Sequence, residues 1–335
     1  MKHFRMLLPA LLVGLCLAPS SSAQDKREWK NHPAIVEIDT QEDVYGLGDV
    51  HGDYERLLTV LVAAKIIPAD PGPPDKVQWQ AGKAVLVCTG DFIDKHDQSL
   101  RVIALLRALQ PAAEKAGGRL VITLGNHEAE FLANPRIKKA AAFVKELEAK
   151  NIKPEDVATG TDAAGIGRWL RSLPVAARVN DWFFVHAGNT HHRTLPQLRA
   201  DLQAGMDKHG YKATVLQDLD SLILARMNPR PWWEKEGDSA AQSKERLRTC
   251  VHALGVKHLV IGHAPAEFTF ADQTTRLAGE MVQHFDGLIF FIDVGMSRAV
   301  AYSTGALLHI RRDQGTVRAA RILASGKSQE IWSGQ

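Results

Sequence analysis

The sequence predicts an α/β protein in which β-sheets and helices form layers, with a helical segment inserted in the core domain. Three observations lead to this prediction. Strand-like and helix-like stretches alternate between residues 43 and 126. A stretch rich in Ala and Lys, residues 132–172, has a helical character. Strand-like stretches then return from residue 175 onward.

The first part of the chain alternates between strands and helices. A strand is expected at 43–48 and an amphipathic helix at 54–66, where Asp53 can cap the first turn. The next strand, helix and strand are expected at 83–91, 98–117 and 119–126. Because helices separate these strands, we expect the strands to run parallel to one another.

The rest of the chain begins with the helical insertion and ends in strands. Residues 132–172 have loops on either side of helix-prone sequence, and we interpret them as a helical cap. The stretch "VAARVNDWFFVHAG" (175–188) predicts two strands joined by a turn at Asn180 and Asp181. Further strands are expected at 258–262, 288–293, 305–311 and 316–322.

The first 23 residues have the pattern of a secretory signal peptide. The basic stretch "MKHFR" precedes the apolar "MLLPALLVGLCLA", and Ser21 and Ala23 then stand at the −3 and −1 spacing of a cleavage site. We therefore expect cleavage after Ala23, a periplasmic or secreted protein, and no stable membrane anchor. A transmembrane anchor is one alternative, but the apolar stretch is short and Pro9 breaks it. A lipoprotein anchored at Cys16 is another, disfavoured by the bulky Leu15.

Charge and cysteine content limit the classes of partner. The chain has 41 Lys and Arg against 38 Asp and Glu, and its net charge of +3 falls to +1 when Lys2 and Arg5 leave with the signal peptide. This balance does not predict a large basic surface, so no nucleic-acid partner is expected. Only Cys88 and Cys250 remain, and their apolar surroundings favour buried free thiols over a disulfide.

Polar side chains follow five of the predicted strands at the point where each strand ends. In "VYGLGDVHGDYERLL" (44–58), Asp49 and His51 follow the first of them. The others are Asp91 and Asp94 in "CTGDFID", Asn126 and His127 in "LGNHE", His186 in "FVHAG" and His263 in "VIGHAP". Because open α/β sheets gather ligands at the carboxyl ends of their strands, we expect these side chains to converge.

The residue types at these strand ends predict a metal centre. A phosphate-binding glycine loop is an alternative for residues 46–52, but the spacing G-x-G-x-x-x-G differs from the dinucleotide pattern. Imidazole, carboxylate and amide ligands without a thiolate suit Mn, Fe or Zn. The ligands are too many for one tetrahedral ion, whereas two ions about 3.5–4 Å apart with a bridging carboxylate fit their number.

The same motifs resemble those of the calcineurin-like metallophosphoesterases. They are GDVHG (48–52), GDFID (90–94), GNHE (125–128), HAG (186–188) and GH (262–263). Within that superfamily they are most similar to the phosphoprotein-phosphatase branch and to its bacterial Shewanella-like phosphatases, whose late motif resembles "FIDVGMS" (291–297). The resemblance covers about residues 43–298. It implies layered mixed β-sheets flanked by helices, in one catalytic domain spanning 24–335.

The resemblance also implies a role for each of these side chains. The implied metal ligands are Asp49 and His51 for a first ion, Asp91 as the bridge, and Asn126, His186 and His263 for a second ion. His127 would be the general acid that protonates the leaving oxygen, and Asp94 would orient its ring and support its charge. A metal-bridging hydroxide would be the nucleophile, because metal-bound water loses a proton more readily than bulk water.

The chain departs from the branch pattern where the substrate phosphate is expected to bind. Related sequences usually carry Arg after the second Asp of GD-x-x-D, but here Lys95 and His96 follow. Lysine can meet a phosphate as a point charge and not as a bidentate fork. A phosphate-binding arginine is expected in "LILARMNPRPWW", at Arg226, with Arg230 as the alternative.

The predicted function is hydrolysis of phosphate monoesters, with phosphorylated protein side chains (Ser/Thr or Tyr) as the expected substrates. Ala264 and Pro265 replace the rest of a GHxH motif, and loss of its second His favours monoesters over diesters. A small-molecule phosphatase or nucleotidase on the same scaffold is one alternative. A non-catalytic module that binds metal or phosphate is another, although the His127 and Asp94 pair argues against it because a pure binder needs no proton donor.

Overall fold

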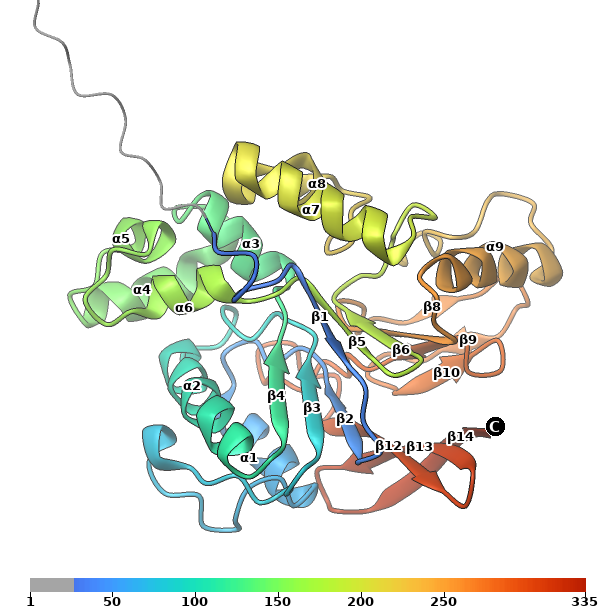
Figure 1. Ribbon diagram of the computed structural model, residues 1–335, viewed down its shortest axis with the longest axis horizontal. Helices are drawn as coiled ribbons and strands as arrows, with labels where there is room; N and C mark the ends of the chain where they lie inside the picture. Colours follow the sequence, from blue (N-terminus) through green and yellow to red (C-terminus); the bar gives the residue numbers. More distant parts are fainter. Residues whose placement is uncertain (1–26) are drawn as a thin grey trace, which may run out of the picture.

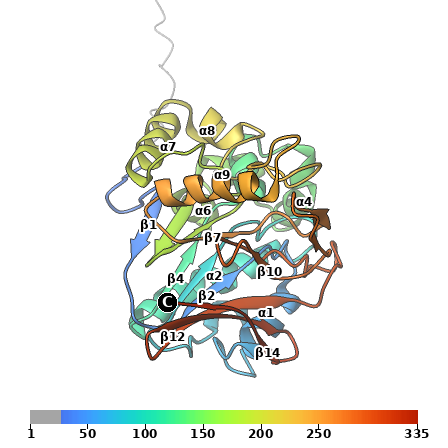
Figure 2. The same ribbon diagram turned by 90° about the vertical axis from the view of Figure 1, so that its right-hand side faces the viewer.

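Two six-stranded sheets with helices on their outer sides form the body of the molecule (Figure 1). The computed structural model describes residues 27–335, so the predicted signal peptide lies outside the described residues. In the side view of Figure 2, α7 (Leu195–His209) and α9 (Ala240–Ala253) lie above the strands, and α1 (Tyr54–Ala63) lies in the lower part of the view. The predicted α/β class with layered mixed sheets is confirmed.

The first sheet contains three of the motif-bearing strands. Its strands are, in spatial order, β14 (Ser328–Gly334), β13 (Thr316–Leu323), β12 (Ala306–Asp313), β2 (Val44–Leu47), β3 (Val85–Cys88) and β4 (Arg119–Ile122). β2, β3 and β4 are parallel, as expected, and the other three strands are antiparallel. The connecting helices are α1 and α2 (Ser99–Lys115), and Asp53 caps α1 by accepting the N–H of Arg56.

The second sheet supplies the other two motif-bearing strands. Its order is β1 (Ile35–Ile38), β5 (Ala176–Val179), β6 (Trp182–Val185), β7 (His258–Ile261), β11 (Ile289–Phe291) and β10 (Val282–His284). β5 and β6 form the predicted antiparallel hairpin through Asn180 and Asp181, whereas β6, β7 and β11 are parallel. A short hairpin of β8 (Phe268–Thr269) and β9 (Thr275–Arg276) stands apart.

The two sheets pack against each other through buried faces. β2, β3, β6 and β7 are buried along their whole length, as is typical of parallel strands that are covered on both sides. Gly46 on β2 faces Phe184 of the other sheet and Ile292, which directly follows β11, and a Cβ there would lie 3.2 and 3.3 Å from their side chains. A residue without a side chain therefore lets the sheets approach closely at this point.

Helices fill the range predicted as an insertion. They are η2 (Lys138–Ala140), α4 (Ala141–Ala149), α5 (Pro154–Thr159) and α6 (Ile166–Ser172), and α3 (Asn126–Ala133) leads into the range. The remaining helical elements are η1 (Pro74–Lys76), η3 (Gly210–Lys212) and α8 (Thr214–Gln217). Between residues 27 and 335, no helix is long and apolar enough to cross a membrane. Cys88 and Cys250 are buried and free, as predicted.

Several elements were not predicted from the sequence. β1, β10 and β14 are partly exposed strands at or near sheet edges, so they lack the continuous apolar run of the central strands. The helices α7 and α9 were also missed, although both begin with a capping box that the sequence displays. Thr194 pairs with Gln197 in one, and Ser239 pairs with Gln242 in the other.

Candidate metal centre

All eight side chains expected at the strand ends lie in the interior, and none is more than 8% exposed. They follow β2, β3 and β4 of one sheet and β6 and β7 of the other. The site therefore lies where the carboxyl ends of strands from both sheets meet. Burial of so many ionisable groups is costly unless they are paired or bind metal.

The backbone bends sharply where it presents these side chains. His51, Asp91, Asp94 and His263 have φ values of 46°, 50°, 66° and 63°, in the left-handed region that most residues avoid. The N–H groups of Val50 and His51 donate to the carbonyl of Asp91 at 3.0 and 2.9 Å, which ties the first two loops together. Such strained positions cluster at functional sites, where the surrounding structure holds them in place.

Glycine is required where the loops after β3 and β4 touch. Gly90 has φ +94°, and a Cβ on it would lie 2.1 Å from the nitrogen of Gly125. Gly48 follows β2, and a Cβ there would lie 2.4 Å from the carbonyl oxygen of Ile292. The glycines of these motifs thus permit close packing of loops, which brings the following side chains together.

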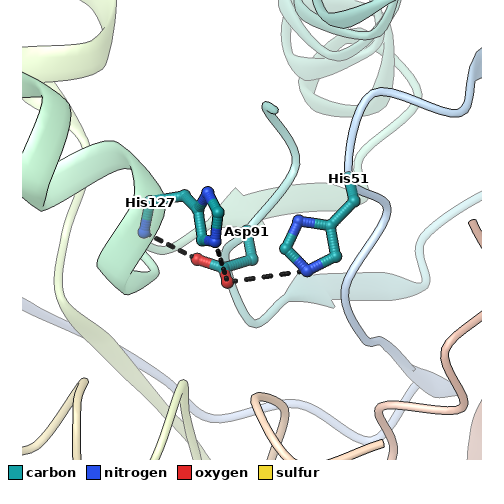
Figure 3. A group of neighbouring side chains, drawn as sticks. All are labelled: His51, Asp91 and His127. Atoms are coloured by element: carbon teal, nitrogen blue, oxygen red, sulfur yellow. Dashed lines mark hydrogen bonds and ion pairs between the residues drawn. The ribbon is translucent and has the colours of Figure 1, made fainter. Parts of the chain in front are cut away.

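Asp91 lies between His51 and His127 (Figure 3). Its Oδ2 is 3.8 Å from Nε2 of His51 and 3.8 Å from Nε2 of His127. Asp49 Oδ2 is 3.7 Å from the same His51 nitrogen. His51 Nδ1 faces the carbonyl of Ile93 at 3.3 Å, and a proton on Nδ1 leaves Nε2 as the atom with a free lone pair. His51, Asp91 and His127 therefore bring three atoms close enough together to hold a first metal ion, and Asp49 lies beside His51.

A second group of ligand atoms converges on Nε2 of His186. That nitrogen is 3.1 Å from Oδ1 of Asn126, 3.3 Å from Oδ2 of Asp91 and 2.9 Å from Nδ1 of His263. His186 Nδ1 lies 2.9 Å from the carbonyl of Thr89, the arrangement in which it donates and Nε2 carries a lone pair. The Asn126 amide donates from Nδ2 to Glu130 at 2.7 Å, so its oxygen faces His186.

These arrangements fit bound cations. Acceptor atoms that face one another at about 3 Å repel unless a proton or a cation lies between them. Burial, then the charges of Asp293 and Asp91, raises the pKa of Asp49 well above its usual range, so Asp49 lacks a sufficient compensating positive charge among the described residues. His263 Nε2 is buried without a hydrogen-bond partner in the part of the chain that the structure describes. Nitrogen and oxygen donors of this kind suit the predicted Mn, Fe or Zn.

His127 and Asp94 form the expected pair beside the ligands. His127 Nδ1 lies 3.2 Å from Asp94 Oδ2, and its Nε2 points to Asp91 (Figure 3). The backbone N–H of His127 donates to Asp91 Oδ1 at 2.9 Å, because His127 lies in the first turn of α3. The geometry thus leaves Nε2 of His127 directed toward the centre of the site.

Glu128 organises two of the motif loops, a role that the sequence analysis did not assign. Its carboxylate accepts backbone N–H groups from Asp91, Phe92, Ile93 and Gly125 at 2.8–3.1 Å. Burial and the nearby charge of Asp91 raise the pKa of Glu128 to about 7. The motif GNHE signalled the contact with Gly125, since Glu at the third helical position is typical of a capping box, but not the contacts with the Asp91 loop.

Asp293 was also missed, although it lies in the quoted stretch "FIDVGMS". It is buried beside Asp49, and its Oδ1 accepts the N–H of Gly295 at 2.9 Å. Its position after β11 is like that of the other motif residues, at the carboxyl end of a parallel strand. A strand end therefore signalled it as well.

The predicted phosphate-binding residues differ in their relation to the site. Lys95 is exposed, but its Nζ lies 2.8 Å from Nε2 of His51. Arg226 and Arg230 are both exposed. Burial, then the neighbouring His186, lowers the pKa of His263, and the charge of Arg226 acts in the same direction, which places Arg226 near the second cluster. In residues 27–335, no hydrogen bond or ion pair joins the Arg230 side chain to the site.

The chain belongs to the calcineurin-like phosphoesterase family, whose sequence model matches residues 43–267. The predicted enzyme class, a metal-dependent phosphatase, is confirmed by this membership and by the relatives. Membership implies divalent metal ions, which agrees with the two clusters of ligands.

A relative and a solved structure agree with the predicted resemblance and with the predicted fold, respectively. Shewanella-like protein phosphatase 2 of Arabidopsis thaliana is 31% identical over 341 residues, 85% of this chain and 79% of that protein. An uncharacterized protein of Schizosaccharomyces pombe is 42% identical over 85 residues, so the chain covers only 24% of its length. The fold matches a crystal structure of a cold-active protein tyrosine phosphatase with a TM-score of 0.66, 23% identity and coverage of 88% of this chain and 80% of that one. The predicted resemblance to Shewanella-like phosphatases is confirmed.

Proposed function

We propose that this chain hydrolyses phosphate monoesters, with phosphorylated protein side chains as its substrates, by means of two divalent metal ions. Asp49, His51 and Asp91 would hold the first ion, and Asp91, Asn126, His186 and His263 the second. The names of the protein phosphatases that it resembles support the substrate class.

The observation that carries this proposal is the position of Asp91. Its Oδ2 faces His51 on one side and His186 on the other, at 3.8 and 3.3 Å. One buried carboxylate oxygen between two groups of nitrogen ligands is the geometry that a bridging ligand requires. Despite burial, the neighbouring His186 and His127 hold the pKa of Asp91 well below its usual range, which keeps it anionic.

The chain's own residues would then complete the reaction. When bound, the ions supply an activated water and positive charge at the phosphate. His127 donates the proton from Nε2 to the leaving oxygen, and Asp94 on Nδ1 holds the ring and stabilises its charge. Lys95 and Arg226 bind the phosphate oxygens from the open side of the site.

The decisive experiment compares wild type with His127→Ala after loading with Mn²⁺. Phosphopeptides carrying pSer, pThr or pTyr are tested beside nucleotides. We expect phosphopeptide turnover by the wild type, about a 10²–10⁴-fold lower kcat in the variant, and unchanged metal content. Metal loss in the variant would make His127 a ligand instead. Turnover of nucleotides alone would favour the small-molecule phosphatase, and binding without turnover would favour the non-catalytic module.

We also propose that the enzyme acts outside the cytoplasm. The basic and apolar N-terminal stretch and the cleavage spacing at Ala23 support this proposal. N-terminal sequencing of protein expressed with its full N-terminus should yield a chain that starts at Gln24. A chain retaining its first 23 residues would contradict it.

A further inference from the structure

Helix α4, in the inserted segment, contacts the carboxylate that supports the proposed general acid. The N–H of Phe143, in the first turn of α4, donates to Asp94 Oδ1 at 3.0 Å. The other oxygen of Asp94 faces His127. N–H groups in the first turn of a helix have no partner within the helix, so this contact satisfies one of them and fixes the carboxylate.

One turn further along α4, Glu146 reaches the start of another helix. Its two carboxylate oxygens accept the N–H groups of Ser99 and Leu100, at 2.8 and 2.9 Å. These groups belong to the first turn of α2, whose N-cap residue Gln98 makes no side-chain capping hydrogen bond. Glu146 thus caps α2 from a different part of the chain. Figure 1 shows α4 above α2, and the two helices are in contact.

Ser99 in turn contacts the loop that carries Asp94. Its hydroxyl oxygen accepts the N–H of Asp94 at 3.1 Å, and Ser99 is fully buried. α4 therefore holds Asp94 twice, directly through Phe143 and indirectly through Glu146 and Ser99. The φ of Asp94 is +66°, a conformation that needs such support.

We infer that Glu146 is a positioning residue for acid catalysis, acting through Ser99 and Asp94 on His127. The segment predicted as a helical cap then also helps to position the general acid. This inference rests on the proposed function, because it requires His127 to be the proton donor.

The test uses two aryl phosphates that differ in leaving group. Phenyl phosphate needs a proton on its leaving oxygen, whereas 2,4-dinitrophenyl phosphate needs it far less. We expect Glu146→Ala to lower kcat on phenyl phosphate about 10-fold, part of what a positioned acid supplies, and on the dinitrophenyl ester less than about 2-fold. Metal content should stay the same. Glu146→Gln keeps the shape of the side chain but replaces one acceptor by a donor, so its kcat on phenyl phosphate should lie between those of wild type and Glu146→Ala. This milder variant keeps the test valid if Glu146→Ala does not fold.

The matched control is Glu148→Gln on the same helix. Glu148 is exposed and pairs with Arg136 at the surface, so its variant should match wild type on both esters. Adding Glu146→Ala to His127→Ala should change kcat no further, because the effect passes through His127. Equal losses on both esters, or additive losses in the double variant, would overturn the positioning role. If His127→Ala itself shows no leaving-group dependence, it is the proposed function that fails.

Discussion

At the scale of single residues, Asp91 is the side chain on which both clusters depend. Asp91→Asn removes the negative charge that would hold two cations, while its shape is kept. We expect both ions to be lost together, so that metal content falls from about two per chain towards zero. Elemental analysis of dialysed protein measures this change.

Asp94→Asn is the matched control for that experiment. Asp94 is equally buried, but it faces Nδ1 of His127 and Phe143 rather than the ligand clusters. This variant should keep its metal and lose activity. Loss of one ion only from Asp91→Asn, or a wild-type plateau at one ion per chain, would contradict the bridging role.

Lys95 stands where the resemblance predicts arginine, and its contact with His51 adds to the prediction for this residue. The contact uses the ring nitrogen that would face the first metal, so Lys95 has to move away when that metal binds. We expect Lys95→Ala to bind Mn²⁺ at least as tightly as wild type and to have a lower kcat/KM for monoesters. The dianionic phosphate of a monoester is attracted strongly by the lysine charge. A diester carries less negative charge, so its kcat/KM should hardly change in Lys95→Ala.

Arg226 should matter more than Lys95, because a guanidinium can bind two phosphate oxygens at once. We expect Arg226→Ala to lower kcat/KM for monoesters further than Lys95→Ala does, with Arg230→Ala as the exposed control near wild type. Steady-state kinetics on one phosphopeptide compares the three variants. A large loss in Arg230→Ala in place of Arg226→Ala would reverse the assignment.

At the scale of elements, the contact between the strand-end loops sets how closely the ligands converge. Gly90→Ala would place a Cβ against the backbone of Gly125 at a φ of +94°, so the loops after β3 and β4 must separate. We expect a loss of stability of about 1–3 kcal/mol and weaker metal binding together. Denaturant unfolding and metal titration measure these effects. Gly82→Ala also has positive φ, but nothing lies within 4 Å of its Cβ, so it should affect stability alone.

The central elements could be predicted because each is a short apolar run followed at once by a polar motif. β2, β3 and β4 and the strands β6 and β7 all have this form. What the sequence does not display is contact across long separations. Glu128 binds the backbone of the Asp91 loop, and Glu146 caps a helix that begins 47 residues before it. No local pattern predicts such partners, because they are decided by how distant segments of the chain pack together.

At the scale of the whole molecule, the site requires that the two sheets stay together, because each supplies part of the ligands. A cluster of aromatic side chains joins the sheets at one edge. His258 on β7 stacks on Trp182 of β6 at 4.0 Å between ring centroids, and it meets Trp332 of β14, in the other sheet, at 4.8 Å. Its Nδ1 donates to the carbonyl of Gly287 at 2.7 Å.

Because burial lowers the pKa of His258, folding should become less favourable in mild acid. The unfolded chain takes up a proton near the ordinary imidazole pKa of about 6.5, but the folded protein does so only at lower pH. The free energy of unfolding therefore falls as pH decreases below about 6.5, by at most about 1.4 kcal/mol per pH unit for this group. His258→Asn keeps an N–H donor and cannot titrate, so its unfolding free energy should depend less on pH between 6.5 and 5.5.

Urea unfolding in the presence of a chelator compares wild type with His258→Asn. The control is His252→Asn, at an exposed histidine. If the free energy of unfolding depends on pH equally in wild type and His258→Asn, the titration of His258 does not contribute to acid sensitivity, and the prediction is wrong.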